Sequence, residues 1–297
     1  MLRIRLLGRM AVECDGAELP APSARRAWSL LAYLALSPGP QPRGELAAHF
    51  WPDVLDSSAR ASLRSAVWSL RRALGPAAEP YLIVDRNCVG LAPGPELWVD
   101  VNAFDALLQA GREREAVELC TGALLAGFEE EWALMARAAH RERLLDVLER
   151  LAQSREAAGV LDEALEWSRR AVAVDPLSED AHRGLIARLA ASGDRARALI
   201  VYRALAERLR RELSVAPSPA TRALVERLRI DAEDGSTVRA SPVSIPAQPL
   251  VGRARELNRL LEVWRGVQPG AGAVVSVCGE AGIGKTRLAS ELLARAG

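Results

Sequence analysis

Residues 57–75 read SSARASLRSAVWSLRRALG, and this stretch decides the fold of the N-terminal part of the 297-residue chain. At 100° per residue, its apolar side chains share one side, which predicts an amphipathic helix over 57–74 packed on a core. We expect Asp56 to be the N-cap and Gly75 to end the helix. The predicted core positions are Leu63, Ala66, Val67, Leu70 and Leu74.

The opposite side of the same helix is polar and basic. Its members are Ser57, Arg60, Arg64, Ser65, Trp68, Arg71 and Arg72. In a major groove, Arg can bond guanine O6 and N7 bidentately, and further guanidinium groups can neutralise phosphates. The pattern therefore favours a DNA-reading helix, although a solvated basic face is an equally typical explanation of such a helix taken alone.

Elements on both sides of this helix predict a winged helix. Two strands with alternating apolar residues, 2–6 and 10–14, precede it and are expected to form a small antiparallel sheet. Two helical segments, 23–36 and 43–50, follow these strands. Following it, residues 81–85 and 88–91 flank a two-residue turn, which predicts a β-hairpin. Arg86 and Asn87 form that turn, where they can reach a neighbouring groove or the DNA backbone. The hairpin after three helices strengthens the DNA interpretation.

The bulk composition limits the class of protein. A formal net charge of +1 means that any nucleic-acid binding must come from local clustering of charge. The four cysteines form no CxxC pair, which is typical of reduced thiols in a cytosolic protein. No apolar run approaches membrane-spanning length, and the N-terminus has no signal region. We therefore expect a cytoplasmic, nucleoid-associated protein with no membrane contact.

A repeated signature predicts paired helices over 99–230. It consists of Gly, four residues, then Ala and an aliphatic residue, and it begins at Gly111, Gly159 and Gly193. The last two copies are 34 residues apart, the tetratricopeptide period. A continuous helical pattern covers about 131–158. These features predict an all-helical array whose units bury their apolar faces on one another.

No catalytic residues are predicted in this helical region. Nothing in it resembles a catalytic pair, and His140 and His182 have no Cys, Asp or Glu partners at metal-ligand spacing.

A phosphate-binding loop stands near the C-terminus. Residues 279–286 read GEAGIGKT, which fits GxxxxGK[ST], and Lys285 is the single lysine of the sequence. In this motif, glycines let backbone N–H groups face the phosphates, the lysine reaches the β- and γ-phosphates, and the threonine hydroxyl ligates Mg²⁺. The predicted nucleotide-binding residues are Gly279, Gly282, Gly284, Lys285 and Thr286, and Thr286 would ligate Mg²⁺ with the nucleotide in a complete domain. A buried strand over 273–278 and a helix over 286–296 are expected around the loop.

Three stretches carry a resemblance to a known family. Residues 27–36, 45–47 and 63–75 resemble the OmpR-type winged helix of SARP-type transcriptional activators, which regulate bacterial secondary metabolism. The resemblance implies that the helix over 57–74 is the recognition helix and that the hairpin is the wing. It also implies binding to double-stranded DNA at promoter direct repeats as a dimer or oligomer, with RNA polymerase as a partner.

The resemblance extends along the chain. Residues 99–230 resemble the bacterial transcriptional activator domain, which implies dimerisation or contact with the winged helix. Val251, Gly252 and Arg253 resemble the adenine-binding box that opens STAND-type and AAA-like ATPases. Winged helix, helical domain and ATPase occur in this order in the large ATPase-bearing SARP regulators, which implies a nucleotide-gated switch with ATP and Mg²⁺ as cofactors.

The predicted architecture is therefore mainly α, with an α+β winged helix at the N-terminus. Its parts are a winged helix (1–98), a tetratricopeptide-like activator domain (99–230), a linker (231–249), and the first strand and helix of a P-loop NTPase (250–297). The sequence ends one helix after the loop, before any Walker-B acid, so we expect an incomplete NTPase at the front of a longer protein and no enzymatic activity in this chain.

One function from a different class also fits the motifs. The chain would then be an ATP-binding signalling or scaffold ATPase whose helical repeats bind protein partners. The basic face would in that case bind protein or nothing, and the salt dependence of DNA binding would separate the two functions.

Overall fold

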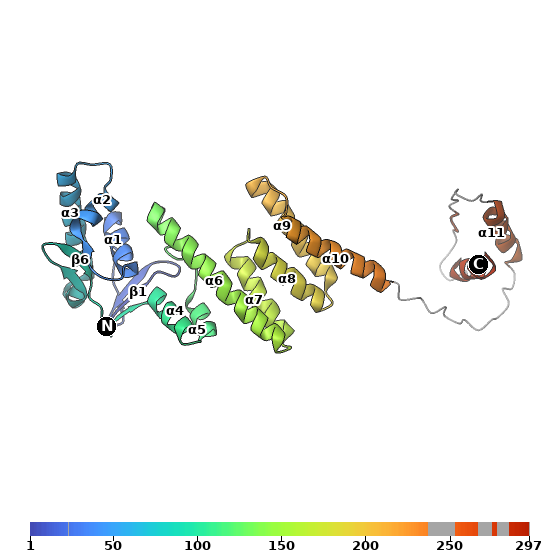
Figure 1. Ribbon diagram of the computed structural model, residues 1–297, viewed down its shortest axis with the longest axis horizontal. Coiled ribbons are helices and arrows are strands. Elements are labelled where there is room, and N and C mark those ends of the chain that lie inside the picture. The colour runs from blue at the N-terminus through green and yellow to red at the C-terminus, as the bar shows by residue number, and fades with distance from the viewer. Residues whose placement is uncertain (23, 237–252, 267–274, 278–284, 297) are drawn as a thin grey trace. The chain divides into compact units, whose positions relative to one another are not determined.

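The computed structural model describes residues 1–22, 24–236, 253–266, 275–277 and 285–296. The chain folds into two compact units, Met1–Ile230 and Asp231–Gly297 (Figure 1). Each unit has a hydrophobic core of its own. We refer to them below as unit 1 and unit 2.

Unit 1 opens with a four-stranded sheet in the order β3-β2-β1-β7. Its strands are β1 (Leu2–Arg5), β2 (Ala11–Cys14), β3 (Ala17–Glu18) and β7 (Leu97–Val99). The alternation seen in the sequence places Leu2 and Ile4 in the core. The predicted antiparallel strands are present, but β7 pairs in parallel with β1, a partner that lies more than 90 residues away and that no local pattern indicates.

The winged helix follows the sequence prediction closely (Figure 1). Its helices are α1 (Arg25–Leu36), α2 (Arg43–Phe50) and α3 (Asp56–Leu74), followed by a 3-10 turn (Pro76–Tyr81). A second sheet, ordered β4-β6-β5, comprises β4 (Gln41–Pro42), β5 (Leu82–Val84) and β6 (Cys88–Leu91). The predicted core positions of α3 are all buried, with Leu63 and Leu70 at 1% and 0% exposure.

Seven helices form the rest of unit 1. They are α4 (Asp100–Gln109), α5 (Glu113–Leu119), α6 (Glu131–Ala157), α7 (Leu161–Val174), α8 (Glu179–Ala191), α9 (Arg195–Leu213) and α10 (Pro219–Ser236). The three signature glycines separate α4 from α5, α6 from α7 and α8 from α9, at positive φ angles of 71°, 74° and 86°. Such φ angles favour glycine. The predicted mainly α architecture is confirmed.

The winged helix and the helical region share one core through a joint, which we define as residues 120–132 with the winged-helix groups that they contact. The backbone N–H of Leu125 donates to Leu6 O at 2.8 Å, and that of Gly8 donates to Ala123 O at 3.1 Å. Trp132 packs edge-on against Tyr33, with ring centroids 5.3 Å apart. The joint therefore combines backbone pairing with aromatic packing.

In unit 2, α11 (Ala254–Gly266) packs on α12 (Lys285–Ala296). Leu257 and Leu261 of α11 form a small core with Leu288 of α12. Both helices read as amphipathic in sequence, and their apolar sides meet here.

Three predictions about boundaries and elements were wrong. Helix α3 begins at Asp56 and Leu55 is its N-cap, because Asp56 instead pairs with Arg60 one turn along. The linker predicted to start at residue 231 is helical as far as Ser236, since α10 continues to that point. Residues 275–277 do not lie in a strand; the rest of 273–278 lies outside the described residues.

Replacing Gly90 with Ala is expected to destabilise unit 1 by about 1–3 kcal/mol. A Cβ on Gly90 would lie 2.5 Å from Pro40 Cα, where the base of the wing meets the turn after α1. Urea unfolding followed by circular dichroism measures the loss. Gly94→Ala is the matched control, since its added Cβ would meet nothing within 4 Å. Equal stability of the two variants would contradict this packing.

Candidate nucleic-acid interface

The exposed side of α3 carries every residue that the sequence assigned to it. Trp68 is 63% exposed. Ser57, Arg60, Arg64, Ser65, Arg71 and Arg72 are exposed as well. The opposite side is fixed in the core against α1 and α2, so the polar side cannot rotate inward without exposing Leu63 and Leu70. The structure therefore presents one basic, partly aromatic helical face to solvent.

The arginines of α3 differ in what their guanidinium groups contact. Arg60 pairs with Asp56, Nη2 to Oδ2 at 3.0 Å, and Arg71 pairs with Glu79 of the 3-10 turn. The guanidinium of Arg72 lies over the Trp68 ring, 5.4 Å from its centroid. Arg64 forms no ion pair with any residue that the structure describes. Because a free guanidinium costs least to redirect, Arg64 is the best placed of the set to bond a DNA base or phosphate.

The wing holds the other two predicted residues. Arg86 and Asn87 lie exposed at the turn between β5 and β6. The turn is shaped by Asp85, whose Oδ1 accepts the backbone N–H groups of Asn87 and Cys88, both at 2.7 Å. The hydrogen bonds from Cys88, its thiol first, lower the pKa of Asp85, so its carboxylate stays charged at neutral pH. The wing tip is therefore a fixed Asx-type turn.

Sequence reasoning missed one residue of this region. Arg43, the first residue of α2, donates from Nη1 to Asp85 O at 3.1 Å, and its backbone N–H donates to Asn87 O at 2.9 Å. These bonds tie the wing tip to the start of α2. No local pattern marks Arg43, because its partners are more than 40 residues away.

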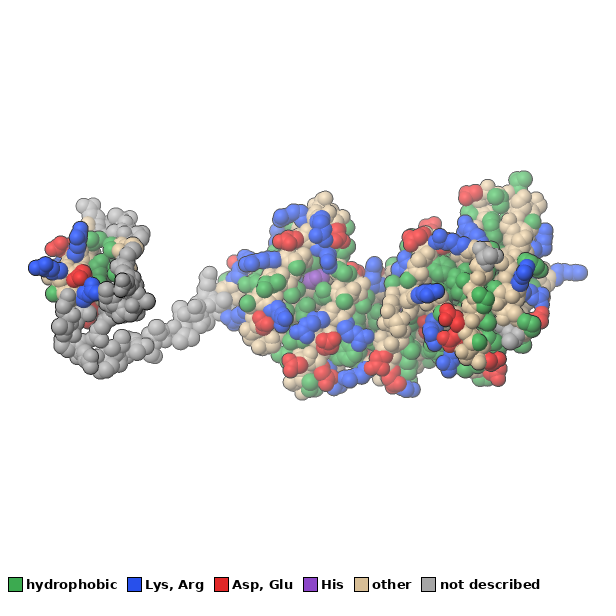
Figure 2. Space-filling model, turned by 180° about the vertical axis from the view of Figure 1, so that it is seen from behind, with side chains coloured by type: hydrophobic (Ala, Val, Ile, Leu, Met, Phe, Trp, Pro, Cys, Tyr) green, Lys and Arg blue, Asp and Glu red, His purple; other side chains and the backbone are tan. Residues whose placement is uncertain are grey.

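The face of α3 and the wing border one hollow. It is lined by Trp68, Arg71 and Arg72 of α3, by Glu79 of the 3-10 turn and by Leu82 of β5. Over the helices of unit 1, Figure 2 shows basic and acidic side chains interspersed on the visible side. The concentration of arginine with tryptophan on α3 differs from that mixed pattern.

The predicted nucleotide-binding residues are only partly described. Helix α12 begins at Lys285, so the last two residues of the predicted loop, Lys285 and Thr286, lie in its first turn. Arg253 precedes α11 and pairs with Glu256, Nη1 to Oε1 at 3.1 Å. Val251, Gly252, Gly279, Gly282 and Gly284 lie outside the described residues. The observed helix start is the one that phosphate binding at a helix N-terminus requires.

Two further features concern the described residues alone. Within them, no group of three or more His, Cys, Asp or Glu side chains could hold a metal ion. No helix among them is both long enough and apolar enough to cross a membrane.

Family models match the two units. Residues 99–229 match the bacterial transcriptional activator domain, and residues 249–297 match the AAA ATPase domain. The first match covers α4 and the helices that follow it in unit 1, and the second covers α11 and α12.

Individual relatives point the same way. Regulatory protein AfsR of Streptomyces coelicolor is 30% identical over 328 residues, which cover 99% of this chain and 32% of AfsR. An uncharacterized protein of Rhizobium meliloti is 49% identical over 47 residues, 16% of this chain and 5% of its own. This chain thus spans about a third or less of the length of these curated relatives.

A solved structure shares the fold of unit 1. Mycobacterium tuberculosis EmbR in complex with a low affinity phosphopeptide superimposes with a TM-score of 0.59 at 24% identity, over 77% of this chain and 65% of EmbR. At this identity the likeness to EmbR shows the fold, and the family matches with the similarity to AfsR confirm the predicted resemblance to SARP-type regulators with an ATPase-like region.

Proposed function

The chain has the domain composition of a SARP-type regulator with an ATPase-like region, and from this premise we propose that it is a sequence-specific DNA-binding transcriptional activator. In this proposal, α3 enters the major groove, and Arg64 reads a base edge. Arg72, Arg86 and Asn87 contact the flanking backbone. The observation that carries it is the exposed face of α3, where Arg64 has no ion pair among the described residues.

Finer features of the function belong to the same proposal. The sites are promoter direct repeats of genes for secondary metabolism, bound by more than one protomer, and the bound protein recruits RNA polymerase. The order of winged helix and activator domain supports these features.

Arg64→Ala is expected to weaken specific DNA binding by about 1–3 kcal/mol, because a bidentate contact to guanine is lost. Fluorescence anisotropy titration of a specific duplex at fixed salt measures the change. Arg203→Ala removes the same charge from an exposed position on α9 and is the matched control. If both variants bind as tightly as the unaltered protein, Arg64 does not read the site.

A nucleotide site is the second proposal, favoured by the AAA ATPase match and by the start of α12 at Lys285. In it, residues 279–286 would hold the phosphates of ATP, and Thr286 would ligate Mg²⁺. If the protein were instead an ATP-binding scaffold for protein partners, its DNA affinity would be weak and indifferent to sequence. Phosphate contacts make log K fall steeply with log salt in specific and non-specific binding alike, so the ratio of affinities for a specific and a random duplex at one salt concentration distinguishes the two functions.

A further inference from the structure

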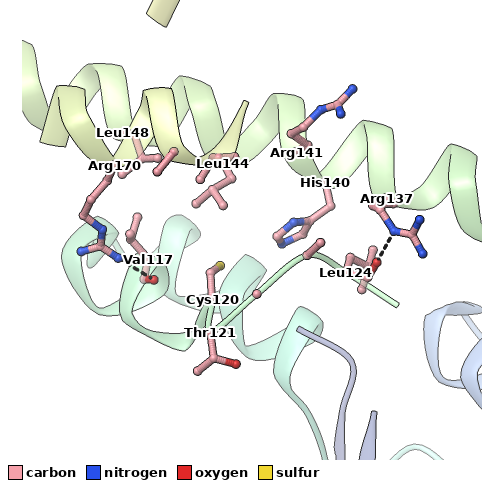
Figure 3. Close-up of a pocket in the computed structure, with 14 residues that line it drawn as sticks. Val117, Cys120, Thr121, Leu124, Arg137, His140, Arg141, Leu144, Leu148 and Arg170 are labelled. Carbon is pink, nitrogen blue, oxygen red and sulfur yellow. Dashed lines mark hydrogen bonds between the residues drawn. The ribbon is translucent and has the colours of Figure 1, made fainter. Parts of the chain in front are cut away.

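A cavity lies in unit 1, on the side of α6 that faces α5, α7 and residues 120–124 (Figure 3). Its volume is about 400 Å³, within the range of small-molecule sites. Val117 of α5, with Leu144 and Leu148 of α6, supplies apolar wall. The cavity is therefore large enough for a small organic molecule with an apolar body.

One buried polar atom borders this cavity without a partner. His140 is 5% exposed, and its Nε2 has no hydrogen-bond partner among the described protein groups. Figure 3 shows the ring directed from α6 toward the cavity and the segment that carries Leu124. The ring packs on Phe104 with centroids 4.9 Å apart, and burial lowers the pKa of His140, so the ring is neutral at neutral pH. Buried polar groups are nearly always paired, so this atom calls for a polar group in the cavity.

The charged side chains that line the cavity are all basic. Arg137, Arg141 and Arg170 line it, and no acidic residue does. Arg137 Nε donates to Leu124 O at 2.8 Å, and Arg170 Nη2 donates to Val117 O at 3.4 Å (Figure 3). Backbone carbonyls carry no net charge, so these hydrogen bonds do not neutralise the guanidinium groups of Arg137 and Arg170. Of these three arginines, only Arg141 pairs with a carboxylate in the part of the chain that the structure describes, Asp175 Oδ2 at 3.4 Å from Nε. The potential in the cavity favours an anion.

We propose that this cavity binds a small amphipathic carboxylate. The apolar body of the ligand packs against Val117, Leu144 and Leu148, and its carboxylate accepts a hydrogen bond from the His140 Nε2–H tautomer. Arg137 and Arg170 supply the favourable field.

The cavity adjoins the joint between the winged helix and the helical region. Its wall residue Thr121 donates from Oγ1 to Leu7 O at 2.7 Å, and Ala123 O accepts the N–H of Gly8. A ligand that contacts residues 121–124 therefore contacts the segment bonded to the N-terminal sheet. This inference rests on the cavity alone and stands or falls independently of DNA binding.

Isothermal titration of the full chain with octanoate tests the proposal, with octylamine as a probe of the same length and opposite charge. His140→Phe keeps a ring against Phe104 but removes Nε2. Ala173→Phe fills the cavity from an exposed wall position, and Ala204→Phe is its control on the exposed side of α9.

A second measurement is the protection of a wall thiol from maleimide. Burial raises the pKa of Cys120 to about 12, so maleimide labelling of this thiol is slow enough to follow by mass spectrometry.

We expect saturable binding of octanoate but not of octylamine, and protection of Cys120 but not of Cys88 from maleimide. The affinity for octanoate should fall about tenfold in His140→Phe, because one charge-assisted hydrogen bond is lost. Binding should disappear in Ala173→Phe but not in the control Ala204→Phe. Absence of saturable binding, equal binding of octylamine, or unchanged binding by Ala173→Phe would each overturn the proposal.

Discussion

Replacing Arg188 with Met is expected to destabilise unit 1 by about 2–4 kcal/mol, less than for a fully buried pair because the side chains of Glu149 and Glu156 are 38% and 43% exposed. Arg188 is 3% exposed in α8 and binds two carboxylates of α6. Its Nη1 and Nη2 donate to Glu149 at 2.9 and 2.7 Å, and its Nε donates to Glu156 at 2.9 Å. A third helix joins through Ser168 of α7, whose Oγ accepts from Nη1 at 3.0 Å. Removing the cation leaves these acids facing each other beside a buried apolar side chain.

Urea unfolding of the full chain, followed by far-UV circular dichroism, measures this loss. Arg112→Met is the matched control, since Arg112 pairs with Glu115 on the exposed surface and such pairs contribute about 0–1 kcal/mol. Arg188→Lys should recover only part of the stability, because an ammonium cannot make the bidentate contact to Glu149. A loss in Arg188→Met no larger than in Arg112→Met would show that the network does not hold the three helices together.

Asp100→Ala should cost about 2–4 kcal/mol, because it leaves buried backbone donors without an acceptor. Asp100 is 3% exposed at the start of α4. Its Oδ2 accepts the backbone N–H groups of Leu6 and Leu7, both at 2.8 Å, and its Oδ1 accepts that of Val101 at 2.8 Å. The carboxylate thereby fixes the end of β1 to the first helix of the activator domain.

Hydrogen exchange of the Leu6 and Leu7 amides, with urea unfolding beside it, tests this role. Both amides should exchange faster in Asp100→Ala, while the amides of α8 should keep their protection relative to the global stability. Asp105→Ala is the control, since Asp105 on the same helix pairs with Arg143 at the surface. Unchanged exchange at Leu6 and Leu7 would mean that other groups hold this end of the sheet.

Local periodicity predicted most of the fold. The sequence pattern over 131–158 corresponds to α6 at 131–157, and the signature glycines stand between paired helices as expected. Such elements are predictable because their signals lie within one turn or one repeat. The pairing of β7 with β1 and the bonds of Asp100 were not predicted, because their partners are more than 90 residues apart. The same holds for Arg188 and its acids.

The sequence predicted which residues lie in the candidate DNA-binding site, but not which of its arginines are held in ion pairs or ring contacts. Helical spacing alone placed Arg60, Arg64 and Trp68 on the exposed side of α3. It could not show that Arg60 is paired within the helix, that Arg71 is paired with Glu79, or that Trp68 packs under Arg72. Those contacts depend on rotamers and on the 3-10 turn. They single out Arg64 as the arginine of the α3 face that has neither an ion pair nor a ring contact among the described residues.

Binding selection from a random duplex pool tests whether α3 reads a DNA sequence. The full chain, Arg64→Ala and the control Arg203→Ala would be compared at low salt, where phosphate contacts are strongest. We expect the unaltered chain and Arg203→Ala to enrich the same short repeated motif and Arg64→Ala to lose it. No enrichment by the unaltered chain, or an unchanged motif in Arg64→Ala, would contradict DNA reading by α3.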